Sequence, residues 1–236
     1  MFGLAKRGLS HLGALLPPRV VKMVTGAADY VALGHWMKAR GFRFSDRVAT
    51  REAIFDRMAA RINATQVPLY LEFGVYYGAS LRYWSGLLTN PAAHLHGFDS
   101  FEGLPEGGGS WTQGEFPVHR IPTFDDPRVK LFPGWFDEVL PSYQLPPHDV
   151  LIVTMDADIY SSTATVLRFL TAHIRPGTLL YFDEMNQLDH EPRALDEFLG
   201  GNGIVVRPLV AHTSLAQAAF ECVEIPAKTT VQPTSG

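Results

Sequence analysis

The sequence lacks several features that would place it in other classes of protein. Its single cysteine, Cys222, excludes an internal disulfide, and its apolar strand-like surroundings favour a core residue over a nucleophile. No apolar run approaches the roughly 20 residues that a membrane-spanning helix needs, and no signal-peptide cleavage site follows the basic, apolar N-terminus. The 24 acidic and 20 basic residues give no general attraction to nucleic acid. We therefore expect a cytoplasmic enzyme with no membrane span and no nucleic-acid partner.

Two common nucleotide-binding signatures, Gly-x-Gly-x-x-Gly and the Walker A loop, are also missing. Instead, the apolar run 68–74 carries Glu72 into a Gly-x-x-x-Gly turn formed by Gly74 and Gly78, with a helix beginning at about Ala79. An apolar run without polar alternation predicts a strand buried on both faces, as in a parallel sheet. Glycines allow positive φ angles and close backbone approach, so a ligand can lie on this turn. A tight turn with only a structural role is the alternative.

Four successive predicted strands end in carboxylates. These acids are Glu72, Asp99, Asp156, and the pair Asp183 and Glu184. In doubly wound α/β sheets ligands bind at the carboxyl ends of the strands, and an acid on the second strand can accept hydrogen bonds from both ribose hydroxyls. Asp99 is the predicted ribose ligand, although an N-cap or turn role would also explain it.

The last two strand ends suit a metal ion. Carboxylates gathered at one edge repel one another unless a cation or hydrogen-bond donors compensate. Asp156, Asp183 and Glu184 are hard oxygen ligands that fit Mg²⁺ or another divalent cation. The alternative is that Asp156 and Asp183 cap the helices that follow them.

Five ordered motifs within residues 67–200 together resemble the macrocin O-methyltransferase family. They span residues 71–76, 97–106, 133–141, 155–163 and 182–184. The resemblance implies a class I S-adenosylmethionine-dependent methyltransferase that acts on a hydroxyl, often of a natural-product sugar, with a divalent metal. Relatives carry Asp-Asp at the last motif, so Glu184 is a departure.

The same resemblance implies a role for particular residues. Asp156, Asp183 and Glu184 would be the metal ligands. The residues that it places around the cofactor are Glu72, Gly74 and Ser80 near the methionine part, Tyr76 beside them, Asp99 on the ribose, and Ser100, Phe101, Trp135 and Phe136 around the adenine.

Methyl transfer from a sulfonium is an in-line displacement, so the protein must align the acceptor oxygen and favour its deprotonation. A Mg²⁺ ion on Asp156 would do both by binding two substrate oxygens. We predict His119 as the base, because it lies in a Gly-rich, aromatic segment, residues 111–120, that resembles the mobile lid of the family. A surface role for His119 is the alternative, and His190 and His212 are further candidates.

The chain divides into three predicted segments. Residues 1–65 form a helical arm whose apolar stripe covers its own sheet, the substrate, or a second subunit in a homodimer. Residues 66–225 form the methyltransferase domain, and residues 226–236 form a flexible tail. Final strands at 204–206 and 218–223 would complete a Rossmann-like three-layer α/β sandwich with a mostly parallel, seven-stranded sheet.

Two other classes share part of this pattern. A nicotinamide-dependent oxidoreductase would also use an acid at the second strand, but it needs the glycine turn that is absent. A catalytically silent nucleotide-binding scaffold would use every proposed ligand structurally. For the methyltransferase the partner is a small-molecule acceptor with a hydroxyl.

Overall fold

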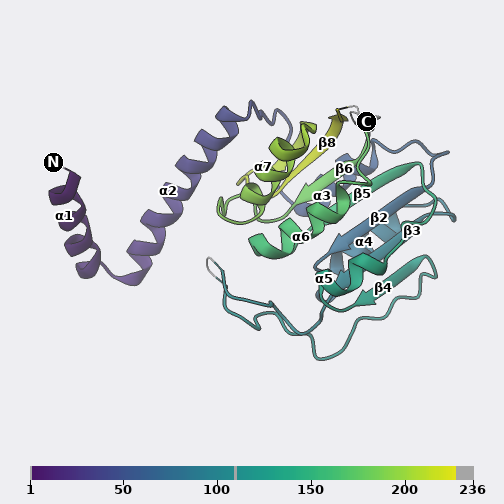
Figure 1. The fold of residues 1–236 in the computed structure, drawn as a ribbon, viewed down its shortest axis with the longest axis horizontal. Helices are drawn as coiled ribbons and strands as arrows, with labels where there is room; N and C mark the ends of the chain where they lie inside the picture. Colours follow the sequence, from purple (N-terminus) through teal and green to yellow (C-terminus); the bar gives the residue numbers. More distant parts are fainter. Residues whose placement is uncertain (1, 109–110, 227–236) are drawn as a thin grey trace, which may run out of the picture. The chain divides into compact units, whose positions relative to one another are not determined.

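The computed structural model describes residues 2–108 and 111–226. It consists of two units, Met1–Gly41 and Phe42–Gly236. The first contains α1 (Phe2–Leu15) and α2 (Pro18–Ala39) (Figure 1). Extended backbone at Pro17 separates the two helices, and Pro18 occupies the first turn of α2, where its missing N–H costs nothing. No helix among the described residues is long and apolar enough to cross a membrane.

The second unit contains one eight-stranded sheet in the order β1-β7-β8-β6-β5-β2-β3-β4. The strands are β1 (Arg47–Val48), β2 (Pro68–Phe73), β3 (His94–Asp99), β4 (Val129–Pro133), β5 (Val150–Met155), β6 (Leu179–Phe182), β7 (Val205–His212) and β8 (Ala218–Glu224). All pairs are parallel except those that β8 makes with β6 and β7. The mostly parallel Rossmann-like sheet is thus confirmed, with eight strands rather than seven.

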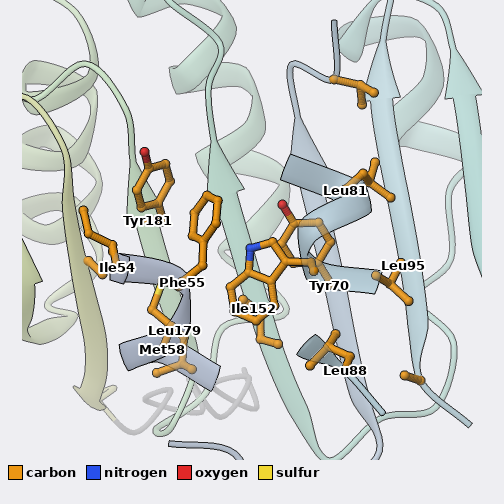
Figure 2. Packing of buried hydrophobic residues seen from close by; sticks show 14 of the residues in the cluster. Ile54, Phe55, Met58, Tyr70, Leu81, Leu88, Leu95, Ile152, Leu179 and Tyr181 are labelled. Carbon is orange, nitrogen blue, oxygen red and sulfur yellow. The ribbon is translucent and has the colours of Figure 1, made fainter. Parts of the chain in front are cut away.

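Helices cover both faces of this sheet. They are α3 (Arg51–Ala59), α4 (Ala79–Leu87), α5 (Phe136–Val139), α6 (Tyr160–Leu170) and α7 (Glu191–Asn202), with a 3₁₀ turn at Leu140–Ser142. On one face α3 and α4 pack in a single apolar cluster with the sheet (Figure 2), where the Phe55 ring lies 5.0 Å from the Tyr181 ring. On the other face α6 packs beside α5 and α7. The apolar side of α3, which lies in the predicted arm, therefore covers the chain's own sheet.

The strand register brings the acidic strand ends together. Glu72 pairs with Gly97 on β3, and Phe73 pairs with Met155 on β5. Met155 in turn pairs with Phe182 on β6. The segments that follow β2, β3, β5 and β6 consequently meet at one edge of the sheet, as the apolar runs predicted.

Candidate active site

A cleft of about 710 Å³ opens at the carboxyl ends of the central strands. Its described lining includes nine of the predicted site residues: Gly74, Tyr76, Asp99, Ser100, Trp135, Phe136, Asp156, Asp183 and Glu184. Four others do not line it: Glu72, Ser80, Phe101 and His119. One cavity thus joins the predicted cofactor turn to the predicted metal carboxylates.

The turn after β2 requires glycine at its first position. Gly74 has a φ of +92°, and a Cβ placed on it would lie 1.8 Å from the backbone oxygen of Asp156. No side chain fits in that space, so the backbones after β2 and β5 touch directly. Gly78, with a φ of +75°, then occupies the N-cap position of α4.

Asp99 organises this turn with its carboxylate. Its Oδ2 accepts hydrogen bonds from the backbone N–H groups of Val75 at 2.8 Å and Tyr76 at 2.7 Å. Its Oδ1 accepts one from Phe101 N at 2.7 Å. A carboxylate offers about four acceptor positions, so one remains for a ligand in the cleft.

Three predicted cofactor residues lie behind the cleft wall. The Phe101 side chain belongs to the apolar cluster under α4, and Ser80 is buried in the first turn of α4. Glu72 is almost fully buried and accepts a hydrogen bond from the Tyr70 hydroxyl at 2.7 Å. Burial raises the pKa of Glu72 to about 8, against the opposing effects of the Tyr70 hydrogen bond and the Arg51 charge. Glu72 is therefore mostly neutral at pH 7.

The two aspartates predicted to hold a metal share a guanidinium. Arg51 Nη1 lies 3.4 Å from Asp156 Oδ2 and 3.8 Å from Asp183 Oδ1. Burial by itself would lower the pKa of Arg51, but the surrounding acidic groups, with Asp183 foremost, together raise it above the ordinary value. Burial raises the pKa of Asp156, and the nearby charges of Asp183 and Asp158 add to the effect. Arg51 is thus the cation that this pair holds.

Other donors complete the surroundings of the acids. Asp183 Oδ1 also accepts hydrogen bonds from the Tyr181 hydroxyl and from Gln217 Nε2. Glu184 Oε2 accepts one from Gln187 Nε2 at 2.7 Å. Within residues 2–108 and 111–226, no group of three or more His, Cys, Asp or Glu side chains is arranged to hold a metal ion.

Sequence reasoning missed the role of two residues in the cleft. Arg51 lies within the predicted arm and was given no role in the site; it follows the N-cap Thr50, whose hydroxyl accepts a hydrogen bond from Ala53 N. Asp158 lies within the motif 155–163 but was given no role. It lines the cleft in a left-handed conformation with a φ of 61°. Burial, with the charges of Glu184 and Asp183, raises the pKa of Asp158 to about 7.

The three histidine candidates lie outside the cleft lining. His119 is exposed. His190 is buried beside Gly108, and burial lowers its pKa. His212 is engaged through both ring nitrogens, by Ser214 Oγ at 2.6 Å and the backbone oxygen of Ala49 at 2.8 Å, which indicates a structural role.

An aromatic wall forms part of the cleft lining. It consists of Tyr76, Trp111 and Phe116, with the Phe116 ring centroid 5.0 Å from that of Trp111 and 6.1 Å from that of Tyr76. The loop that carries Trp111 and Phe116 is tied back on itself by a hydrogen bond from Leu104 N to the backbone oxygen of Glu115. Ser161 Oγ of α6 donates to Glu106 on the same loop at 2.5 Å.

Comparisons with known proteins point to one class of enzyme. Residues 71–185 match the family model described as a methyltransferase domain. This part of the chain is therefore similar to methyltransferases, the class that the sequence motifs predicted. The match favours this class over the nicotinamide-dependent oxidoreductases.

More specific likenesses are to O-methyltransferases of natural products. The 8-demethyl-8-(2,3-dimethoxy-alpha-L-rhamnosyl)-tetracenomycin-C 4'-O-methyltransferase of Streptomyces olivaceus is 28% identical over 157 residues. That alignment covers 57% of this chain and 59% of the relative, so the chain matches less than two thirds of the relative's length.

Two solved structures share the fold. The O-methyltransferase NovP has a TM-score of 0.59 and 19% identity, covering 73% of this chain and 80% of its own. CalS11, a calicheamicin methyltransferase, has a TM-score of 0.56 and 24% identity, covering 72% of this chain and 76% of its own.

Proposed function

We propose that the chain transfers the methyl group of S-adenosylmethionine to a hydroxyl of a sugar on a small-molecule natural product, with the help of a divalent metal ion. The observation that carries the proposal is the single cleft that joins the Gly74 turn and Asp99 to the acids after β5 and β6. The relative from Streptomyces olivaceus, whose name describes methylation of a sugar on tetracenomycin C, supports the acceptor class.

The cofactor would lie along the Gly74 side of the cleft. The free acceptor position of Asp99 would accept a hydrogen bond from a ribose hydroxyl, and the lining residues Ser100, Trp135 and Phe136 would surround the adenine. Glu72, Ser80 and Phe101 would act from behind the wall by holding the turn and the first turn of α4 in position, rather than by touching the cofactor.

The acceptor hydroxyl would face Asp158. A base works best when its pKa is near the operating pH, and the pKa of about 7 at Asp158 meets that requirement. Asp158 also lines the cleft, whereas His119 is exposed outside the lining. We therefore assign Asp158 as the residue that takes the hydroxyl proton, in place of His119.

The carboxylates of Asp156, Asp183 and Glu184 fit a divalent cation in their chemistry, since the first two already share a positive charge. When bound, such an ion would stabilise the developing alkoxide of the acceptor. For these acids to hold the ion, Arg51 would have to release at least one of the two aspartates.

Two measurements test the function. Calorimetric titration should show binding of S-adenosylmethionine and none of NAD. Methyl transfer to phenyl α-L-rhamnoside, followed by mass spectrometry, should stop in excess chelator and return with Mg²⁺. The matched control is Asp158→Asn, which should bind the cofactor but not turn over. Cofactor binding without transfer to any glycoside would indicate a silent scaffold, and full transfer in chelator would refute the metal.

A further inference from the structure

We infer that α1, the first helix of the chain, lies on the surface of an anionic lipid membrane. Its apolar side enters the boundary between head groups and acyl chains, and its basic side chains contact the head groups. The inference concerns the unit Met1–Gly41 by itself. It goes beyond the proposed function and does not depend on it.

The side chains of α1 divide into an apolar side and a basic side. Each residue of an α-helix is rotated by about 100° from the one before it, so Leu9, Leu12 and Leu15 lie within one third of the circumference. Lys6 and Arg7 lie on the opposite side. The three leucines are 68%, 53% and 83% exposed, and no described side chain of α1 is buried. The helix is therefore amphipathic, with its apolar side open to solvent.

The second helix of the same unit continues this exposed apolar surface. Met23, Val24, Tyr30 and Val31 recur at the spacing of one side of a helix, and each is at least 42% exposed. Of the 13 large apolar side chains that are exposed in the described part of the chain, eight lie in residues 1–41. Such a concentration on one surface marks an interaction site.

The unit Met1–Gly41 is also the basic part of the chain. Residues 1–41 contain six lysines and arginines and one acid, Asp29, which gives a formal net charge of +5. Residues 42–236 contain 14 basic and 23 acidic side chains, with a formal net charge of −9. Each lysine or arginine near an anionic lipid surface strengthens binding by about fivefold. Charge attraction to such a surface is therefore confined to the unit that exposes the apolar side chains.

A second copy of this chain fits the apolar side of α1 less well. Two copies of the unit Met1–Gly41 that paired with each other would bring like charges together, and these repel. The acidic second unit of another copy would attract α1, but its described part exposes only five large apolar side chains, on the separate segments 76–77, 121, 205 and 223. A lipid surface offers the leucines a continuous apolar region beside its anionic head groups.

The test is co-sedimentation of the full chain with lipid vesicles. Vesicles of equimolar phosphatidylcholine and phosphatidylglycerol should bind the protein at least about tenfold more tightly than vesicles of phosphatidylcholine alone. The difference should shrink in about 0.5 M salt, because ions screen the attraction between the basic side chains and the head groups.

One pair of variants tests the basic side of α1. Lys6→Gln combined with Arg7→Gln should weaken binding to the anionic vesicles about 25-fold, since two charges are lost. Glutamine favours helix about as well as lysine and arginine do, and circular dichroism checks that α1 persists. The matched control, Arg120→Gln combined with Lys130→Gln, removes two charges at exposed positions of the second unit and should leave vesicle binding unaltered.

A second pair tests the apolar side without any change of charge. Leu9→Gln combined with Leu12→Gln should weaken binding to the anionic vesicles at least about tenfold, because less apolar surface leaves water. Val205→Gln combined with Val223→Gln makes a similar change at exposed positions of the second unit and should have no effect.

Three results would overturn the inference: equal binding to neutral and anionic vesicles, no binding to either, and binding that the α1 variants leave unaltered. Light scattering identifies the competing occupant. A dimer that Leu9→Gln combined with Leu12→Gln dissociates, in a protein that binds no vesicles, would show that the apolar side of α1 joins two copies. Absence of S-adenosylmethionine binding would refute the proposed function and leave the vesicle measurement decisive for α1.

Discussion

Replacement of Arg51 by glutamine should destabilise the metal-free protein and make it respond more strongly to Mg²⁺. The guanidinium lies 3.4 Å from Asp156 and 3.8 Å from Asp183. At an effective dielectric constant of about 20, each contact has a gross attraction of about 4 to 5 kcal/mol. Desolvation of the three charged groups cancels most of it.

The partial burial of Arg51 and the two aspartates determines the net cost of the substitution in stability. The side chains of Arg51, Asp156 and Asp183 are 28%, 26% and 15% exposed. Breaking a fully buried pair costs about 3 to 5 kcal/mol, whereas a surface pair contributes about 0 to 1 kcal/mol. An intermediate cost of about 2 kcal/mol would lower Tm by about 4 to 8 °C in a chain of this size.

Thermal unfolding in chelator and in excess Mg²⁺ measures both effects. In chelator, Arg51→Gln should unfold at a lower temperature than the wild type, and Arg51→Lys, which keeps the charge but not the planar fork, should fall between them. Mg²⁺ should recover most of the loss in the glutamine variant, because the two aspartates are then free to bind it. Equal stability of wild type and Arg51→Gln in chelator would refute the reasoning, as would an identical response of both to Mg²⁺.

Three further variants test other parts of the site. The pKa of Glu72 is about 8 in the folded protein, against an ordinary value of 4.5, so the folded state holds a proton on this carboxyl. Its contribution to stability is therefore complete below about pH 4.5 and is lost as the pH rises through 8. Glu72→Gln should flatten this pH dependence of the free energy of unfolding, measured by urea unfolding at about pH 5 and pH 8. Asp99→Ala should weaken S-adenosylmethionine binding about ten- to a hundredfold by calorimetry, and unchanged affinity in a folded variant would rule out the ribose contact. Asparagine tolerates the left-handed backbone at position 158, so Asp158→Asn should fold, lower kcat by at least about 100-fold and change cofactor affinity little. In the wild type, kcat/KM should rise with pH through about 7. A wild-type profile that is flat between about pH 6 and 8 would contradict the assignment of Asp158 as the base.

Local patterns in the sequence were sufficient to predict the central strands. The runs that became β2 and β5 are apolar apart from Glu72 and Thr154 because both of their faces are covered, and both strands are buried along their whole length. By contrast, β4 is a partly exposed edge strand with a broken apolar pattern, and it was not predicted. At two residues, β1 is too short to have a pattern of its own.

The candidate site likewise contains residues that local sequence patterns predict and residues that they do not. The acids at the strand ends were predictable because each follows an apolar run directly. The contact of Arg51 with Asp156 joins residues 105 positions apart in the chain, so no local signal announces it. His119 was favoured for its neighbours in the sequence, but position in a long loop does not determine which way a side chain faces.

The contact between Gly74 and the backbone of Asp156 limits how the candidate site can be redesigned. Because no atom separates the two segments, a substitution that shifts one must displace the other, and the proposed site for the methyl donor cannot be altered independently of the strand that presents the acids. The side chains of Trp111 and Phe116 are held by ring contacts rather than by such a backbone contact, whereas Gly103 on the same loop also packs closely against the backbone oxygen of Glu115. Attempts to broaden the range of acceptors are therefore best directed at that loop, with the glycine turn left unchanged.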